Sequence, residues 1–233
     1  MKPISTRAYN QHVTRQLPAH TGRAPASARG ARTREALVLA AREVFERDGF
    51  LEARITDITA HAGVAAGSFY TYFTSKEDAF AAVMDDVNEE MLHPRLTTAA
   101  TDREDPIAVI EAANRAYLEA YRRNAKLMAL MEQVAQVDED FRKLRLKRAR
   151  AFVQRNARAI SRLQQRGLAD PDLDPTISAH AMSSMVSRMA YARYVQGLGT
   201  ASADALCTTL TRLWANALGI TTRVDTRPTP TRS

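Results

Sequence analysis

The sequence predicts an all-α fold divided into two domains. Apolar residues recur at offsets of three and four along most of the chain, and no alternating segment long enough for a β-strand interrupts them. Glycine and proline cluster at a few positions, as expected where helices end. The chain has 233 residues, 45% of them apolar, which is long for one compact domain and sufficient for the cores of two.

The basic charge of the chain is concentrated at its ends. There are 33 basic and 26 acidic residues, a net charge of +7, yet the first acidic residue is Glu35. Residues 1–31 contain scattered Pro, Gly, Ala and Ser and are expected to form a disordered basic arm, and residues 220–233 a flexible tail. Such an arm either contacts DNA or only increases solubility; Arg32 and Arg34, nearest the first helix, are the best candidates for a contact.

The segment 55–76 is interpreted as two short helices that meet at Gly63. The first buries residues three and four apart: Ile55, Ile58, Thr59 and Ala62. Gly63 adopts the left-handed backbone of a tight turn at little cost. In the second helix Phe69 and Phe73 share a buried face, which leaves small, hydroxylated and aromatic residues facing outward. The pattern is typical of a helix-turn-helix, although helical proteins that do not bind DNA also contain it.

Two longer motifs surround this segment. The motif A-x-x-x-F-x-x-x-G-(F/Y) is present at Ala41, Phe45, Gly49 and Phe50. The motif G-V-x-x-G-(S/T)-(F/L)-Y-x-Y-F-x-(S/N)-K is complete from Gly63 to Lys76. On these motifs, residues 33–84 resemble the N-terminal domain of the tetracycline-repressor (TetR) family. The resemblance implies a DNA-binding domain at residues 32–78 and a ligand-responsive repressor; the alternative is a protein that binds DNA without sequence preference through its basic ends.

Carried over position by position, the resemblance implies contacts with double-stranded operator DNA. The expected residues are Thr56, Ala66, Gly67, Ser68, Tyr70, Thr71, Tyr72 and Lys76, with Arg54 as an additional phosphate contact. Two positions depart from the family, because Arg54 and Ala65 replace its usual Ser or Thr helix caps, each worth about 1 kcal/mol. The recognition helix has no Arg, Asn or Gln, so bidentate base readout is expected to be weak and DNA shape to matter.

The remaining pattern predicts an all-helical domain over residues 79–219. The expected helices are 76–98, 106–124, 125–137, 138–166, 175–198 and 201–218. The resemblance implies that this domain binds a small effector and forms a homodimer, with derepression when the effector binds.

Methionine and aromatic residues at helical spacing are expected to line a pocket for an apolar or amphipathic effector. These residues are Met84, Met91, Tyr117, Tyr121, Met128, Met131, Phe152, Met185 and Met189. Methionine adapts to irregular ligands and tyrosine adds a polar group, although such a stripe can equally be plain core.

Apolar stripes on the last two helices predict the dimer interface. They comprise Ile177, Ala181 and Ser184 on one helix and Leu206, Leu210, Leu213, Trp214 and Ala217 on the other. By resemblance these helices pair with their copies in a four-helix bundle; the alternative is that they only close the core of one subunit. Two recognition helices about 34 Å apart would require a near-palindromic operator.

Composition and motifs argue against catalysis and membrane insertion. The five histidines form no metal-binding motif, and there is no nucleophile elbow or phosphate-binding loop, so the sequence predicts no enzyme, no cofactor and no metal. The chain has no apolar run of 18 residues and no signal-peptide core, which predicts a cytoplasmic protein without a membrane partner.

Overall fold

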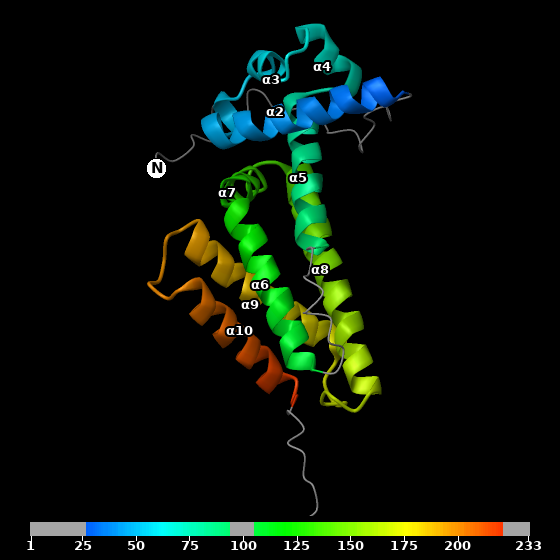
Figure 1. Ribbon diagram of the computed structural model, residues 1–233, viewed down its shortest axis with the longest axis vertical. Coiled ribbons are helices and arrows are strands. Elements are labelled where there is room, and N and C mark those ends of the chain that lie inside the picture. The colour runs from blue at the N-terminus through cyan, green and yellow to red at the C-terminus, as the bar shows by residue number, and fades with distance from the viewer. Residues whose placement is uncertain (1–26, 94–104, 221–233) are drawn as a thin grey trace, which may run out of the picture.

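The computed structural model describes residues 27–93 and 105–220. These residues form nine helices and no strand, which confirms the all-α prediction. The molecule is elongated, with the N-terminal helices at one end and a helical bundle below them (Figure 1). The expected basic arm up to residue 26, residues 94–104 and the expected tail from residue 221 lie outside the described residues.

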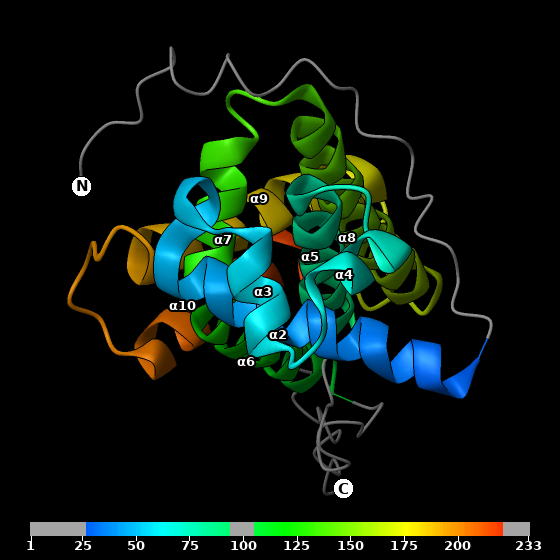
Figure 2. The same ribbon diagram turned by 90° about the horizontal axis from the view of Figure 1, so that it is seen from above.

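Three helices form the N-terminal domain. They are α2 (Ala28–Glu52), α3 (Ile55–His61) and α4 (Ala66–Tyr72), and seen from above, α3 and α4 lie over α2 (Figure 2). Helix α2 begins earlier than expected, because Ser27 caps it by accepting a 3.1 Å hydrogen bond from the Gly30 amide. Residues 28–31, predicted to belong to the disordered arm, are therefore helical.

The C-terminal domain contains the six remaining helices. They are α5 (Lys76–Leu92), α6 (Pro106–Arg123), α7 (Ala125–Val134), α8 (Glu139–Gln165), α9 (Pro175–Tyr194) and α10 (Ala203–Ala217). Helix α5 runs from the N-terminal domain down into the bundle, α8 packs along α9, and α10 packs along α6 (Figure 1). The predicted helices are all present, with ends that differ by a few residues, and α9 ends at Tyr194 instead of Leu198.

Four buried phenylalanines connect the two domains. Phe45 and Phe50 of α2 lie 5.0 and 5.1 Å from the ring of Phe80 in α5, and the Phe80 ring lies 5.4 Å from that of Phe141 in α8. The edge-on and tilted arrangements are those that aromatic rings prefer. This cluster makes the core continuous from the N-terminal helices into the bundle. A shift of α5 or α8 would therefore change the packing of α2.

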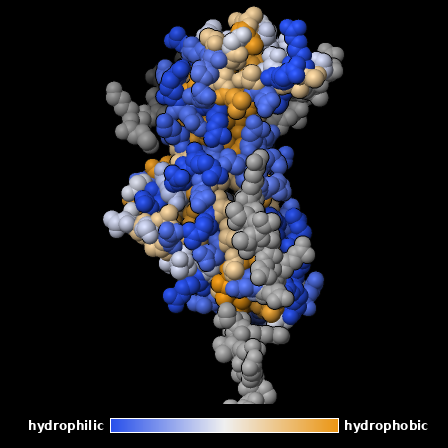
Figure 3. Space-filling model, in the orientation of Figure 1, coloured by the Kyte–Doolittle hydropathy of each residue, from blue (hydrophilic) through white to orange (hydrophobic). Residues whose placement is uncertain are grey.

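Hydrophilic side chains predominate on the face shown in Figure 3, and hydrophobic ones reach the surface in small strips. Among the described helices, none is both long enough and apolar enough to cross a membrane. The described residues also contain no cluster of three potential metal ligands.

Candidate DNA-binding and ligand-binding sites

The turn between α3 and α4 has the predicted helix-turn-helix geometry. Gly63 has φ +66°, the left-handed conformation that the turn requires, and the amide of Val64 donates to the Thr59 carbonyl at 3.0 Å. Phe69 and Phe73 are buried with their ring centroids 5.5 Å apart. Burial of these two rings orients α4, so its opposite face is turned toward solvent.

The exposed face of α4 carries most of the residues of this helix that were predicted to contact DNA. Tyr70 is 64% exposed, and Ala66, Gly67 and Thr71 are also exposed. Ser68 and Tyr72 are half-buried, and Tyr72 packs against the core. The face is small and hydroxylated, so a groove wall can approach the backbone closely.

The N-termini of α3 and α4 lack side-chain caps, as the sequence predicts. Arg54 precedes α3 and Ala65 precedes α4, and neither makes a side-chain cap hydrogen bond. Arg54 and Thr56 are both exposed at the start of α3. The first amides of these short helices are therefore left for another acceptor, and a DNA phosphate is an acceptor of the right kind.

The two arginines of α2 lie in different environments. Arg32 is exposed, whereas Arg34 is half-buried with its guanidinium carbon 5.3 Å from the centre of the Phe73 ring. A guanidinium over an aromatic face is held by the ring electrons. Arg34 is thus positioned beside the end of α4, and Arg32 is the freer of the two.

Lys76, one of the predicted phosphate contacts, also makes intramolecular contacts at the end of α2. Its ammonium donates to the carbonyls of Leu51 and Ala53, at 3.1 and 3.0 Å, and lies 5.0 Å from the centre of the Phe50 ring. Burial lowers the pKa of Lys76, and nearby acidic residues counteract part of that shift. The positive charge caps the C-terminal carbonyls of α2, where the helix dipole favours a cation.

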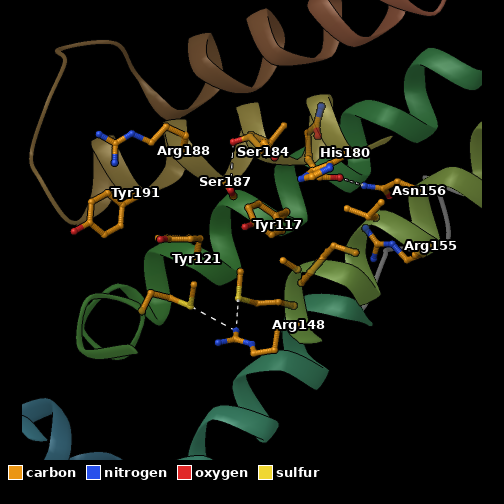
Figure 4. A pocket seen from close by; sticks show the side chains of 18 of the residues that line it. Tyr117, Tyr121, Arg148, Arg155, Asn156, His180, Ser184, Ser187, Arg188 and Tyr191 are labelled. Atoms are coloured by element: carbon orange, nitrogen blue, oxygen red, sulfur yellow. Dashed lines mark hydrogen bonds between the residues drawn. The ribbon is translucent and has the colours of Figure 1, made fainter. Parts of the chain in front are cut away.

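A cavity of about 660 Å³ opens in the C-terminal domain between α6, α7, α8 and α9 (Figure 4). Six of the nine predicted pocket residues line it: Met91, Tyr117, Tyr121, Met128, Met131 and Phe152. A volume of this size suits a drug-sized molecule.

The other three predicted pocket residues do not line the cavity. Met84 is fully buried in the core, Met185 packs against the core, and Met189 is 43% exposed. Helical spacing alone does not distinguish residues of the core from residues that line a cavity, because both lie on apolar helix faces.

Polar residues of the cavity wall escaped the sequence-based search. They include five residues labelled in Figure 4, namely Arg148, Arg155, Asn156, His180 and Arg188, and also Ser183, whose hydroxyl accepts a hydrogen bond from Asn156. The sequence does contain one sign of these polar residues. Arg148 lies seven residues after Phe141 and four before Phe152 on α8, so the spacing places an arginine on an apolar face of the helix. Burial raises the pKa of both Tyr117 and Tyr121, so their hydroxyls stay protonated at neutral pH.

The predicted dimer residues separate into two groups. Ile177 is 71% exposed and Leu213 46% exposed, and Ala181, Ser184 and Ala217 are also exposed. In contrast, Leu206, Leu210 and Trp214 are buried within the subunit, where α10 packs on α6. These three residues were wrongly placed at the dimer interface, because the helix has two apolar sides and only one of them faces solvent.

The molecule therefore combines a helix-turn-helix domain with a helical domain that contains a cavity, the architecture of a one-component transcriptional regulator. Residues 37–83 match the family described as bacterial regulatory proteins of the tetR family, and residues 110–219 match the C-terminal domain of the transcriptional regulator EthR. The chain belongs to the TetR family of transcriptional regulators, which are DNA-binding regulators and not enzymes.

Two named relatives match part of the chain. The repressor BepR of Brucella suis is 33% identical over 94 residues, covering 40% of this chain and 45% of BepR. The regulator YdgC of Bacillus subtilis is 36% identical over 63 residues, covering 27% of this chain and 32% of YdgC. The matched region thus spans less than half the length of either relative.

Solved structures share the fold over most of the chain. A TetR-family regulator from a Rhodococcus species has a TM-score of 0.69 at 18% identity, covering 81% of this chain and 99% of that one. SmeT, the repressor of a Stenotrophomonas maltophilia multidrug efflux pump, has a TM-score of 0.63 at 21% identity, covering 85% and 96%. SmeT has also been solved in complex with triclosan.

Proposed function

We propose that the protein is a ligand-responsive repressor that binds a near-palindromic operator as a homodimer through α4. The observation that carries the proposal is the division of α4 into a buried side, Phe69 and Phe73, and an exposed side that includes Tyr70 and Thr71. The exposed side is small enough to enter a major groove, and the uncapped N-terminal amides of α3 and α4 would donate hydrogen bonds to phosphate oxygens.

Two copies of the chain would pair through the exposed residues of α9 and α10. Ile177 and Leu213 are large apolar side chains on these two helices, and the neighbouring exposed residues are small. Small residues let helices of two subunits approach closely, and the apolar residues would be removed from water on pairing. A two-fold axis here would place two copies of α4 on successive major grooves.

An effector would enter the cavity and release the operator. The cavity is lined by α6 and α8, and α8 is joined to α2 through the phenylalanine cluster, so a ligand that favours one arrangement of these helices also favours one position of α4. That SmeT has been solved with triclosan supports a small apolar or amphipathic effector for this fold.

The decisive experiment is a competition binding assay on the promoter nearest the gene. A repressor should prefer its operator over an unrelated duplex by about a thousandfold or more, whereas a protein that binds through its basic ends alone would bind both equally, with the same salt dependence. The variant Tyr70→Ala/Thr71→Ala should lose the preference while keeping its thermal stability. Arg150→Ala, at an exposed position on α8, is the matched control and should bind as the wild type does.

A further inference from the structure

The cavity wall carries more positive than negative charge. Among the described residues that line it are four arginines and a single acidic residue: Arg145, Arg148, Arg155, Arg188 and Glu132. Glu132 is already used, because its Oε2 accepts a 3.1 Å hydrogen bond from Arg145. Three arginines therefore line the cavity without a carboxylate from its wall.

Arg148 is the most deeply placed of these arginines. It is 7% exposed, and its guanidinium donates to Oδ1 of Asn88 at 3.3 Å and points at the sulfurs of Met128 and Met91, at 3.6 and 3.9 Å (Figure 4). Thioether sulfur is a weak acceptor, and a guanidinium has five N–H donors and remains charged inside proteins. Nε thus donates to an oxygen, whereas Nη2 is directed at two weak sulfur acceptors.

Arg148 keeps its positive charge although it is buried, because the guanidinium group has a very high pKa. Burial lowers the pKa of Arg148, while Tyr117, Asp85, Tyr121 and Glu132 act in the opposite direction. A buried cation that keeps its charge is stabilised strongly when an anion forms charge-assisted hydrogen bonds with it.

Arg155 adds a second positive group on the same side of α8. It lies seven residues after Arg148, a spacing that returns to the same helix face, and both arginines lower the pKa of Tyr117 against the raising effect of burial. Its Nη1 donates to the Leu92 carbonyl at 2.6 Å, and its guanidinium carbon lies 5.4 Å from the Phe152 ring centre. Arg148 and Arg155 therefore both act on the Tyr117 hydroxyl, which lines the same cavity.

The part of the wall around Tyr117 and Phe152 is aromatic and apolar, whereas Asn156, His180 and Ser183 line the cavity elsewhere as uncharged or weakly basic polar groups. The Tyr117 and Phe152 rings meet edge to face with centroids 5.5 Å apart, and Met131 and Tyr121 also line the cavity. Rings and thioethers accommodate an alkyl chain or an aryl ring, but they offer nothing to a second charged group.

We propose that the cavity binds amphipathic anions, with the anionic group at the guanidinium of Arg148 and an alkyl or aryl body among Tyr121, Met131 and Phe152. The inference rests on the proposed ligand-responsive function and adds to it the charge of the ligand. A carboxylate would replace the sulfur contacts of Arg148 with charge-assisted hydrogen bonds. A neutral ligand of the same shape would leave the buried cation with its weak partners.

Trp214 provides a direct measure of occupancy. It is the single tryptophan of the chain, it lines the cavity, and its indole N–H has no hydrogen-bond partner among the described residues. The full-length protein would be titrated with 4-phenylbutyrate, 4-phenylbutanamide and 4-phenylbutylammonium, which share one apolar body and differ in charge. Tryptophan emission would give each Kd without DNA in the assay.

We expect the carboxylate to bind at least about tenfold more tightly than the amide, and the ammonium to bind weakest. Arg148→Met, which keeps an unbranched apolar side chain but removes the guanidinium and its charge, should abolish the difference between acid and amide, and Arg148→Lys should retain part of it. Arg150→Met, which removes one charge from an exposed position of the same helix, should leave all three Kd values unchanged.

Three results would overturn the inference: equal binding of acid and amide, no binding of any probe up to its solubility limit, or a preference for the acid that survives in Arg148→Met with a wild-type melting temperature. If Arg148→Met unfolds, Arg148→Lys and the wild-type probe series still decide the question. Because these titrations contain no DNA, a failure here is distinct from a failure of operator binding, which the competition assay measures.

Discussion

Arg42 Nη2 donates a 2.6 Å hydrogen bond to Oδ1 of Asn124 and thereby joins α2 of the DNA-binding domain to the junction of α6 and α7. Asn124 is completely buried, and its amide nitrogen donates to Oε2 of Glu90 and to the Ala120 carbonyl. Glu90 in turn accepts from Arg123 at 2.7 Å. This network connects α2, the first helix of the DNA-binding domain, to α6, which also lines the cavity.

Asn124→Ala should therefore destabilise the protein and weaken the link between the domains. The substitution leaves Arg42 and Glu90 without their shared partner, and we expect a loss of about 1–3 kcal/mol in the free energy of unfolding. Denaturant unfolding measures this loss. Lys126→Ala, at an exposed position two residues away, is the control, and a wild-type stability for Asn124→Ala would contradict the structural role of the network.

Acid should weaken the same network through Glu90. Burial alone would raise the pKa of Glu90, but hydrogen bonds from Asn124 and Arg123 outweigh it and lower the pKa below the ordinary 4.5. Because the folded-state pKa is lower than that of the unfolded chain, these bonds stabilise the protein above the ordinary value and are lost as pH falls through the lowered one. The melting temperature of Glu90→Gln should lie below that of the wild type at pH 7 and approach it in acid; a constant gap between the two would refute the prediction.

Lys76→Met separates a structural role from a phosphate contact. We expect a loss of about 1 kcal/mol in stability, because the carbonyls of Leu51 and Ala53 lose their donor. Operator affinity should fall without a change in its salt dependence. If Lys76 instead neutralises a phosphate, the slope of log K against log salt would fall in magnitude by about 0.9.

Gly67→Ala should affect stability and DNA binding in opposite directions. Gly67 lies within α4, and an added Cβ would meet nothing within 4 Å. Alanine in a helix interior is favoured by about 0.5–1 kcal/mol over glycine, so the free energy of unfolding should rise. Operator affinity should fall, because in the proposed complex the new methyl group would face the groove wall. An unchanged affinity would mean that this side of α4 does not approach the DNA.

Ile177→Glu combined with Leu213→Glu tests the proposed subunit contact. Both side chains are exposed in the subunit, so charges there should not harm its folding, but they would be costly in an apolar interface. Sedimentation velocity should show a monomer, and circular dichroism should show the helical content of the wild type. Leu146→Glu on α8, where the leucine is 44% exposed, should sediment like the wild type. A double variant that sediments unchanged would place the interface elsewhere.

Local sequence patterns were sufficient for the helices and for the helix-turn-helix. Ser75 is a residue type that favours the start of a helix, and at the start of α5 its hydroxyl accepts from the Asp78 amide at 3.2 Å. Gly63 and the Phe69/Phe73 pair were also assigned correctly, because a turn and a helical face are set by residues within a few positions of one another. The missing caps at Arg54 and Ala65 follow from the same local rules.

Tertiary packing decided what the apolar and basic residues of these helices contact. Lys76 bonds to carbonyls more than twenty residues away, and Arg148 turns its charge toward α5 and α7. Leu210 and Leu213 belong to one apolar pattern, yet the first is buried and the second exposed. A helical period identifies the faces of a helix, but it contains no information on which distant helix covers each face. The sequence alone therefore determined the helices and the recognition segment, whereas the cavity, its arginines and the free faces of α9 and α10 depend on contacts between residues far apart in the chain.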